Sequence, residues 1–200
     1  MSQLQAFADT VTHLQAEWTS GWHDNPTSPK SDLPWSIVEY NHRMNFDLWH
    51  EEDIARRDDL GAERVRQAKR NIDGFNQRRN DAIERMDSWF LSSIAVRPEG
   101  PLNSETPGMM VDRLSILALK LYHMQLEADR ASATEEHRRK CSEKAVILKE
   151  QLGDLAKCLD ELLGQLQAGT RRFKVYRQFK MYNDASLNPQ LYGKTAPTKP

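Results

Sequence analysis

The chain of 200 residues is poor in cysteine, glycine, proline and β-branched residues. Its two cysteines, Cys141 and Cys158, match no metal-binding spacing. On one helix they would stand about 25 Å apart, too far for a disulfide. Nine glycines and nine prolines are too few for a low-complexity chain. No glycine-rich phosphate loop, G-x-S-x-G, H-E-x-x-H or paired C-x-x-C motif is present. These absences exclude several common catalytic designs.

An excess of charge of one sign is missing too, since 28 Lys and Arg stand against 29 Asp and Glu. This balance argues against nucleic acid as a partner, because extended binding needs many phosphate contacts. The apolar runs are short, so we expect no membrane span. Residues 1–15 lack a charged region followed by an apolar core, so we expect no secretory signal. The expected location is the cytoplasm.

Most of the chain has the composition and apolar spacing of helices. We predict an all-α, single-domain bundle with five main helices and a short basic C-terminal helix. Their expected ranges are 2–18, 34–60, 62–95, 108–130, 134–168 and 171–182. Residues 1–33 are expected to form an N-terminal helix and a flexible connection, 34–185 the bundle, and 186–200 an irregular tail.

Polar residues form rows on the second and third helices. Steps of three and four place Asn45, Trp49 and Glu52 on one face of the second helix. Asn76 and Asn80 follow the third helix, where asparagine is a poor helix former. Such residues suit hydrogen bonds to a neighbouring helix or to a ligand. Both interpretations remain open from the sequence.

Three carboxylates are candidate ligands for a divalent ion, Mg²⁺ or Mn²⁺: Glu52, Glu84 and Asp87. Glu84 and Asp87 form an E-x-x-D pair, similar to that of the helical nucleoside-triphosphate pyrophosphohydrolases, which hold magnesium. Ala55 and Arg56 stand where those enzymes carry a further acidic residue. His50 or Glu52 is the candidate general base.

Cations on the fourth helix and in the C-terminal segment are candidate phosphate contacts. Arg113 and Lys120 are seven residues apart and share one side of a helix. We expect Asp112 or a carboxylate of the third helix to neutralise Arg113. The basic segment contributes Arg177 and Lys180, and Asn183 follows it. A snorkelling surface helix is the alternative explanation of this segment.

Four blocks together resemble a bacterial family, domain of unknown function family 4254. They are NFDLWHEEDIARR, KRNIDGFNQRRNDAIERMD, ETPGMMVDRLSILALKLYHM and YRQFKMYNDASLNPQLY, in this order over about residues 41–192. The blocks contain the polar rows described above. The resemblance implies no particular activity.

The functional hypothesis is a polar pocket between the second, third and fourth helices, closed by the basic segment. It would bind a phosphorylated small molecule, such as a nucleotide or nucleotide sugar. Arg113, Lys120, Arg177 and Lys180 would contact phosphate, and Asn76, Asn80 and Asn183 hydroxyl groups or base edges. Hydrolysis or transfer at phosphate is the reaction to test. The alternative is a non-catalytic adaptor that forms a homo-oligomer through its leucine-rich fifth helix.

Overall fold

The computed structural model describes residues 4, 6–24, 30, 32–95, 99–177, 184 and 186–189. Within these ranges the protein is an all-α bundle, as predicted. Its helices are α1 (Phe7–Asp24), α2 (Trp35–Ile54), α3 (Ala62–Ser93), α4 (Pro107–Asp129) and α5 (Glu135–Ala168), with a short 3-10 helix η1 (Asp58–Leu60). None of the described helices has the length and apolar character needed to cross a membrane.

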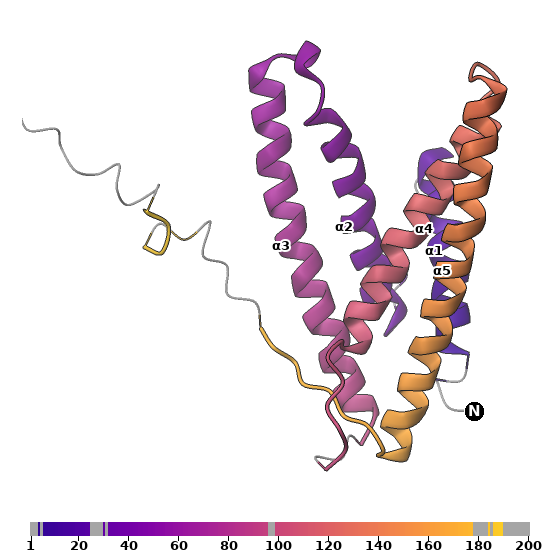
Figure 1. Ribbon diagram of the computed structural model, residues 1–200. Helices are drawn as coiled ribbons and strands as arrows, with labels where there is room; N and C mark the ends of the chain where they lie inside the picture. The colour runs from indigo at the N-terminus through magenta and orange to yellow at the C-terminus, as the bar shows by residue number, and fades with distance from the viewer. Residues whose placement is uncertain are drawn as a thin grey trace, which may run out of the picture.

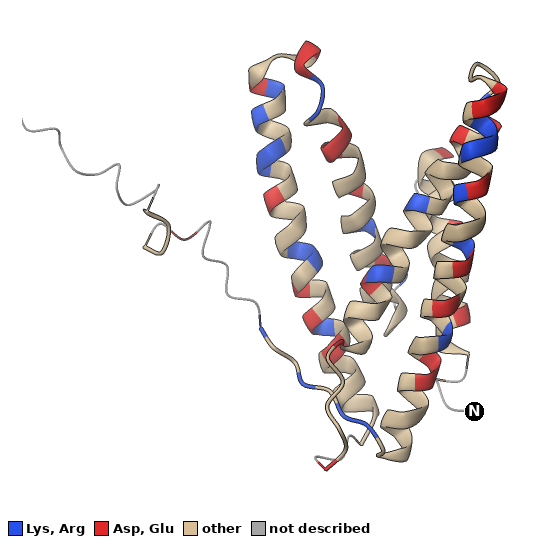
Figure 2. Ribbon diagram, in the orientation of Figure 1, with Lys and Arg blue, Asp and Glu red and all other residues tan. Residues whose placement is uncertain are grey.

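Two long hairpins, α2–α3 and α4–α5, dominate the architecture (Figure 1). They meet near the start of α4 and diverge toward their tips, while α1 packs mainly on α4 and α5. Both signs of charge are spread along α3 and α5 (Figure 2). The groups predicted on α2, α3 and α4 can therefore meet where the two hairpins converge.

Local signals in the sequence explain where α4 and α5 begin and where α5 ends. Thr106 caps α4 by accepting a hydrogen bond from the Met109 N–H at 3.2 Å, and Pro107 occupies the first turn. Thr134 caps α5 in the same way through the His137 N–H. Gly169 ends α5 at φ 72°, in the left-handed region that glycine enters without strain. Helix α3 also matches its predicted range closely.

The prediction for the first helix was wrong at its C-terminal end. The sequence indicated a stop near Trp18, yet α1 continues through Gly21 to Asp24. Trp18 and Trp22 stack with ring centroids 6.1 Å apart, and Trp22 also meets Phe46 of α2 edge to face. This packing outweighs the weak helix propensity of Gly21. At α2, the helix ends at Ile54; a turn follows, and η1 occupies residues 58–60 at the end of the predicted range.

The predicted basic helix is a second correction, because residues 171–177 are not helical. Arg172 bridges to Leu102, and its N–H donates to the Pro101 carbonyl at 3.1 Å. The Asn103 N–H donates to the Arg172 carbonyl at 2.8 Å. Backbone groups used in this way cannot also form helical hydrogen bonds. Phe173, 3% exposed, anchors the extended segment in the core.

The core is shared by all five helices. Leu114 of α4 and Leu159, Leu163 and Leu166 of α5 are completely or almost completely buried. Helix α1 adds Phe7, which contacts Trp35, Trp89 and Phe90. Only the C-terminal half of the leucine-rich row on α5 is buried in this core, since Val146 is 68% exposed.

Candidate functional site

A buried carboxylate, Asp112 of α4, lies where α2 and α3 approach α4. Asn41 and Asn45 of α2 each donate a side-chain N–H to its Oδ1 at 2.9 Å. The Asn45 amide also donates to the Ser115 hydroxyl at 3.0 Å. Residues Asn41, Asn45 and Ser115 are at most 4% exposed. A charge at this depth needs such donors, because an unpaired buried charge is costly.

His42 extends this network to α1. Its Nε2 lies 2.9 Å from the Thr19 hydroxyl and its Nδ1 2.8 Å from the Ser115 hydroxyl. The Thr19 hydroxyl donates to the Gln15 carbonyl at 2.7 Å, so it accepts from His42 Nε2–H. His42 Nδ1 then accepts from Ser115. Burial lowers the His42 pKa to about 3, so the imidazole is neutral at physiological pH.

Arg79 of α3 faces the network from the other side. Its Nε lies 3.7 Å from Asp112 Oδ1, and the side chain is 27% exposed. Among the described residues, the buried Nε has no hydrogen-bond partner. A buried guanidinium nitrogen without an acceptor is unusual, because buried polar atoms are generally paired. Arg79 Nε therefore faces Asp112 without forming a hydrogen bond to it.

Two cavities adjoin Arg79. The Trp49 cavity, of about 410 Å³, lies between α2, α3 and α4 and is lined by Asn45, Leu48, Trp49, Glu52, Asp53, Arg56, Arg79, Ile116 and Leu119. The Glu84 cavity, of about 260 Å³, lies between α3 and α4; its lining includes Arg79, Asn80, Glu84, Asp87, Asp112 and Tyr176. The first is within the volume range of small-molecule pockets, and the second is slightly below it.

The structure does not bring the three predicted metal ligands together. Glu52 lines the Trp49 cavity, whereas Glu84 and Asp87 line the Glu84 cavity. Across the described ranges, no group of three or more His, Cys, Asp or Glu side chains is arranged to hold a metal ion. Spacing along one helix places two carboxylates on a face, but it does not determine which helix supplies a third.

Asp87 has a structural partner instead. Its Oδ1 accepts from the Gly108 N–H at 2.7 Å, at the start of α4. Burial raises the Asp87 pKa to about 6, although hydrogen bonds from Thr106 and Gly108 act in the opposite direction. A Cβ at position 108 would lie 2.6 Å from Asp87 Oδ1, which explains the glycine there. Asp87 thus joins the end of α3 to the first turn of α4.

The two candidate general bases, His50 and Glu52, lie in different surroundings. Glu52, in the last turn of α2, pairs with Arg56 just beyond the end of the helix, at 2.8 Å. His50 is half-buried in a cluster with His23 and His123, at ring-centroid distances of 5.3 and 6.1 Å. His50 does not line the Trp49 cavity, whereas Glu52 does.

Of the two predicted cations of α4, Arg113 lines the Glu84 cavity beside Arg79 and Lys120 does not. Arg113 pairs with Glu105, with both carboxylate oxygens 2.7 Å from Nη1, which corrects the expected pairing with Asp112 or α3. It lines both the Glu84 cavity and a groove of about 690 Å³ between α4 and α5. Lys120 lines that groove and does not line either cavity beside Arg79.

The remaining predicted residues divide into those near Arg79 and those the structure does not describe. Asn80 is buried and lines the Glu84 cavity, while Asn76 is half-buried one turn earlier. Arg177 lies 3.9 Å from Glu84, and the neighbouring Tyr176 lines the same cavity. Lys180 and Asn183 lie outside the described residues. The extended segment thus reaches the Glu84 cavity without forming a helix.

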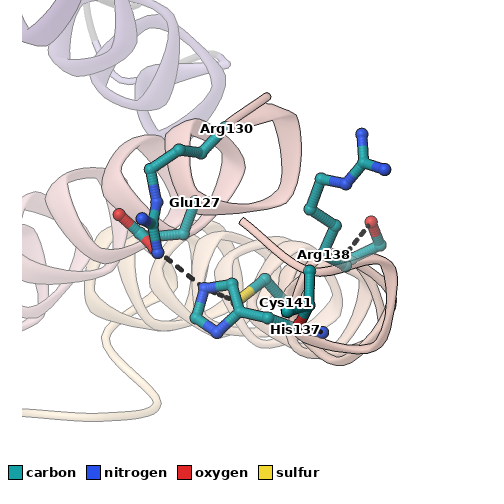
Figure 3. A network of polar contacts seen from close by, with 7 residues as sticks. Glu127, Arg130, His137, Arg138 and Cys141 are labelled. Carbon is teal, nitrogen blue, oxygen red and sulfur yellow. Dashed lines mark hydrogen bonds and ion pairs between the residues drawn. The ribbon is translucent and has the colours of Figure 1, made fainter. Parts of the chain in front are cut away.

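A second polar group, at the tip of the α4–α5 hairpin, resembles a catalytic cluster in composition (Figure 3). His137 Nε2 lies 2.8 Å from Glu127 Oε2 and 3.4 Å from Cys141 Sγ. His137 Nε2 donates its proton to Glu127. The same nitrogen therefore cannot accept a proton from the Cys141 thiol, as a catalytic base would have to do. Arg130 adds a contact to Glu127 at 2.9 Å. The arrangement ties α4 to α5.

Sequence reasoning missed Arg79, the central cation of the site, and also Asn41 and His42. One signal for Arg79 was present. The apolar row of α3 runs through Ile72 and Phe75 to Ala82, and Arg79 stands in the gap. A cation in an otherwise apolar helix face indicates a buried partner or a cavity.

These features define an all-α protein with a buried polar network beside two cavities at the junction of two hairpins. The chain belongs to the family described as Protein of unknown function (DUF4254), whose model matches residues 35–175. The match begins at the start of α2, so α1 lies outside it. Searches of curated proteins and of solved structures found no match.

Proposed function

We propose that the cavities beside Arg79 bind a phosphorylated small molecule and that Arg79 is its phosphate contact. The observation that carries this proposal is that Arg79 lines both cavities, while its carboxylate neighbour Asp112 lies 3.7 Å from Nε, beyond hydrogen-bond distance. Guanidinium groups bind phosphate through two parallel N–H donors. Asp112 faces the buried Nε at 3.7 Å, and the 27% of the Arg79 side chain that is exposed would meet the phosphate.

The lining of the Trp49 cavity indicates the remainder of the ligand. Leu48, Ile116 and Leu119 form apolar walls, and Trp49 offers an aromatic surface. Glu52 and Asp53 can accept hydrogen bonds from hydroxyl groups. A ring-bearing ligand with hydroxyls and phosphate, such as a nucleotide or nucleotide sugar, fits this combination.

The proposal concerns binding. A divalent ion shared by Glu52, Glu84 and Asp87 has no support from their positions in two different cavities. Hydrolysis or transfer at phosphate stays a prediction, to be tested on any ligand that binds. A cytoplasmic, bacterial setting is part of the same proposal, and the free thiols of Cys141 and Cys158 support a reducing compartment.

A thermal-shift screen against nucleotides, nucleotide sugars and sugar phosphates, with and without Mg²⁺ or Mn²⁺, tests the proposal. A ligand at 100 times its Kd should stabilise the fold by about 2.7 kcal/mol. We expect Arg79→Gln to weaken binding at least tenfold, and Arg78→Gln to retain it. Arg78 is the matched control, since it is exposed and stacks over Phe75 of its own helix.

Silence across the panel, or a ligand that Arg79→Gln binds as tightly as the wild type, would contradict the proposal. A ligand that binds only with the metal, and that Glu84→Gln no longer binds, would support the divalent-ion hypothesis after all. A hit that is indifferent to metal would favour a binding protein.

The adaptor interpretation has a specific observation in its favour. Val146 and Ile147 on α5 are 68% and 54% exposed, and Leu126 on α4 is 50% exposed. Light scattering of the purified chain distinguishes this alternative. A stable dimer that Val146→Glu converts to a monomer, together with silence in the ligand screen, would favour an adaptor.

A further inference from the structure

Three histidines from three helices meet at the C-terminal end of α1. The ring of His23 has its centroid 5.3 Å from both His50 of α2 and His123 of α4. The His50 and His123 centroids are 6.1 Å apart. His23 Nδ1 lies 2.6 Å from the Thr19 carbonyl and therefore carries a proton that it donates there.

Aromatic rings enclose the three imidazoles. Trp49 stacks on His123 at 4.5 Å with an interplanar angle of 2°, and Tyr122 stacks on His23 at 4.7 Å. Phe46 meets both His23 and His50 edge to face, at 4.8 and 4.5 Å. Within the described structure, the buried His123 Nε2 has no hydrogen-bond partner. These surroundings suit neutral rings and offer little solvation to an imidazolium.

Other titratable or charged groups act on the cluster from the packed helices: Arg43, Asp47 and Asp53 on α2, Tyr122 on α4 and, through Asp47, Arg78 on α3. Burial and His23 lower the pKa of His50, and burial, His23 and His50 lower that of His123 to about 4. Asp53 raises the pKa of both histidines, but its effect is smaller than the sum of the effects that lower them. Protonation of one ring therefore opposes protonation of the next.

We infer that His23, His50 and His123 form a proton-operated clasp, which holds the last turn of α1 against α2 and α4 while the rings are neutral. Uptake of a second proton places two like charges about 5–6 Å apart among aromatic rings. The last turn of α1 is the part that yields, because it is the end of its helix and carries only one of the three histidines. The clasp is independent of any ligand at Arg79.

The test combines histidine NMR titration with amide exchange in the full chain, from pH 8 to pH 3, so that the range passes the His123 pKa of about 4. In the wild type, the last turn of α1 should lose protection, after correction for intrinsic exchange, as the second imidazole titrates. In His50→Gln, the His123 midpoint should move to higher pH, because one like charge has gone. The loss of α1 protection should then occur at lower pH and be smaller.

His13→Gln is the matched control, since His13 is an exposed histidine on the same helix, and it should change neither midpoint nor protection. His123→Gln provides a second variant in case His50→Gln fails to fold. The clasp is overturned if His50→Gln leaves the His123 midpoint unchanged. It is equally overturned if the last turn of α1 keeps its protection after all three rings are protonated.

Discussion

His42 is completely buried between Thr19 and Ser115, and its environment determines how stability responds to acid. Its pKa falls from 6.5 to about 3 on folding, so the unfolded chain binds the extra proton. Stability present above pH 6.5 is therefore lost as pH falls toward 3, at about 1.4 kcal/mol per pH unit. Asp87, with its raised pKa, acts in the opposite direction between about pH 6 and pH 4.

We predict that His42→Gln removes this component of the pH dependence. Urea unfolding of the wild type and the variant at pH 7, 6 and 5 measures this component. Asp87 is present in both proteins, so its effect cancels in the difference between their free energies of unfolding. The free-energy gap between the two proteins should shrink by about 1 kcal/mol or more from pH 6 to pH 5. A gap independent of pH would mean that the pKa of His42 is the same in the native and the unfolded protein. His13→Gln, at an exposed position, should parallel the wild type.

The residues of the site show what a sequence can and cannot disclose. The polar row on α2 singled out Asn45 and left open whether its partner is a neighbouring helix or a ligand. That partner, Asp112, could not be predicted, because helical periodicity orders groups along one helix and carries no information about the facing helix. Arg78 and Arg79 look alike in sequence, and only the phase of α3 places one against Phe75 and the other against Asp112.

At the scale of elements, α3 and α4 are joined through the contact of Asp87 with Gly108. We predict that Gly108→Ala destabilises the protein by about 1–3 kcal/mol, the usual range for overpacking. The new Cβ would lie 2.6 Å from Asp87 Oδ1 and 2.7 Å from the Ile83 carbonyl, so both helices must shift. The midpoint of urea unfolding measures the loss.

Gly153→Ala is the control for this substitution. Gly153 lies inside α5, and a Cβ there would meet nothing within 4 Å. Alanine should stabilise the helix by about 0.5–1 kcal/mol, because glycine loses more backbone entropy on folding. If both variants lose stability equally, the close approach of Asp87 to Gly108 is not the cause.

The elements that were predicted well are those with local signals at their ends. Thr106 with Pro107, Thr134, and Gly169 mark the boundaries of α4 and α5 in the sequence itself. The errors arose where tertiary contacts decide. The Trp18–Trp22 stack extends α1, and the pairing of Arg172 with the loop at Leu102 prevents a helix. Neither partner is visible from local propensity.

At the scale of the whole molecule, the family match and the physical core differ in extent. The match begins at residue 35, yet α1 contributes Phe7, Val11 and Trp18 to the core, each at most 3% exposed. Burial of three such side chains stabilises the fold by roughly 5–9 kcal/mol. That is comparable to the whole free energy of unfolding of an ordinary domain.

We therefore predict that a chain of residues 32–200, which contains the complete family match, does not fold cooperatively alone. Its near-ultraviolet circular dichroism should be weak and its binding of a hydrophobic dye strong, because α1 no longer covers Phe90 and His42. A peptide of residues 1–30 added in trans should restore cooperative melting. Cooperative unfolding of the truncated chain within about 5 °C of the full protein would show instead that α2 to α5 are sufficient, and that α1 is an accessory to a domain that is stable without it.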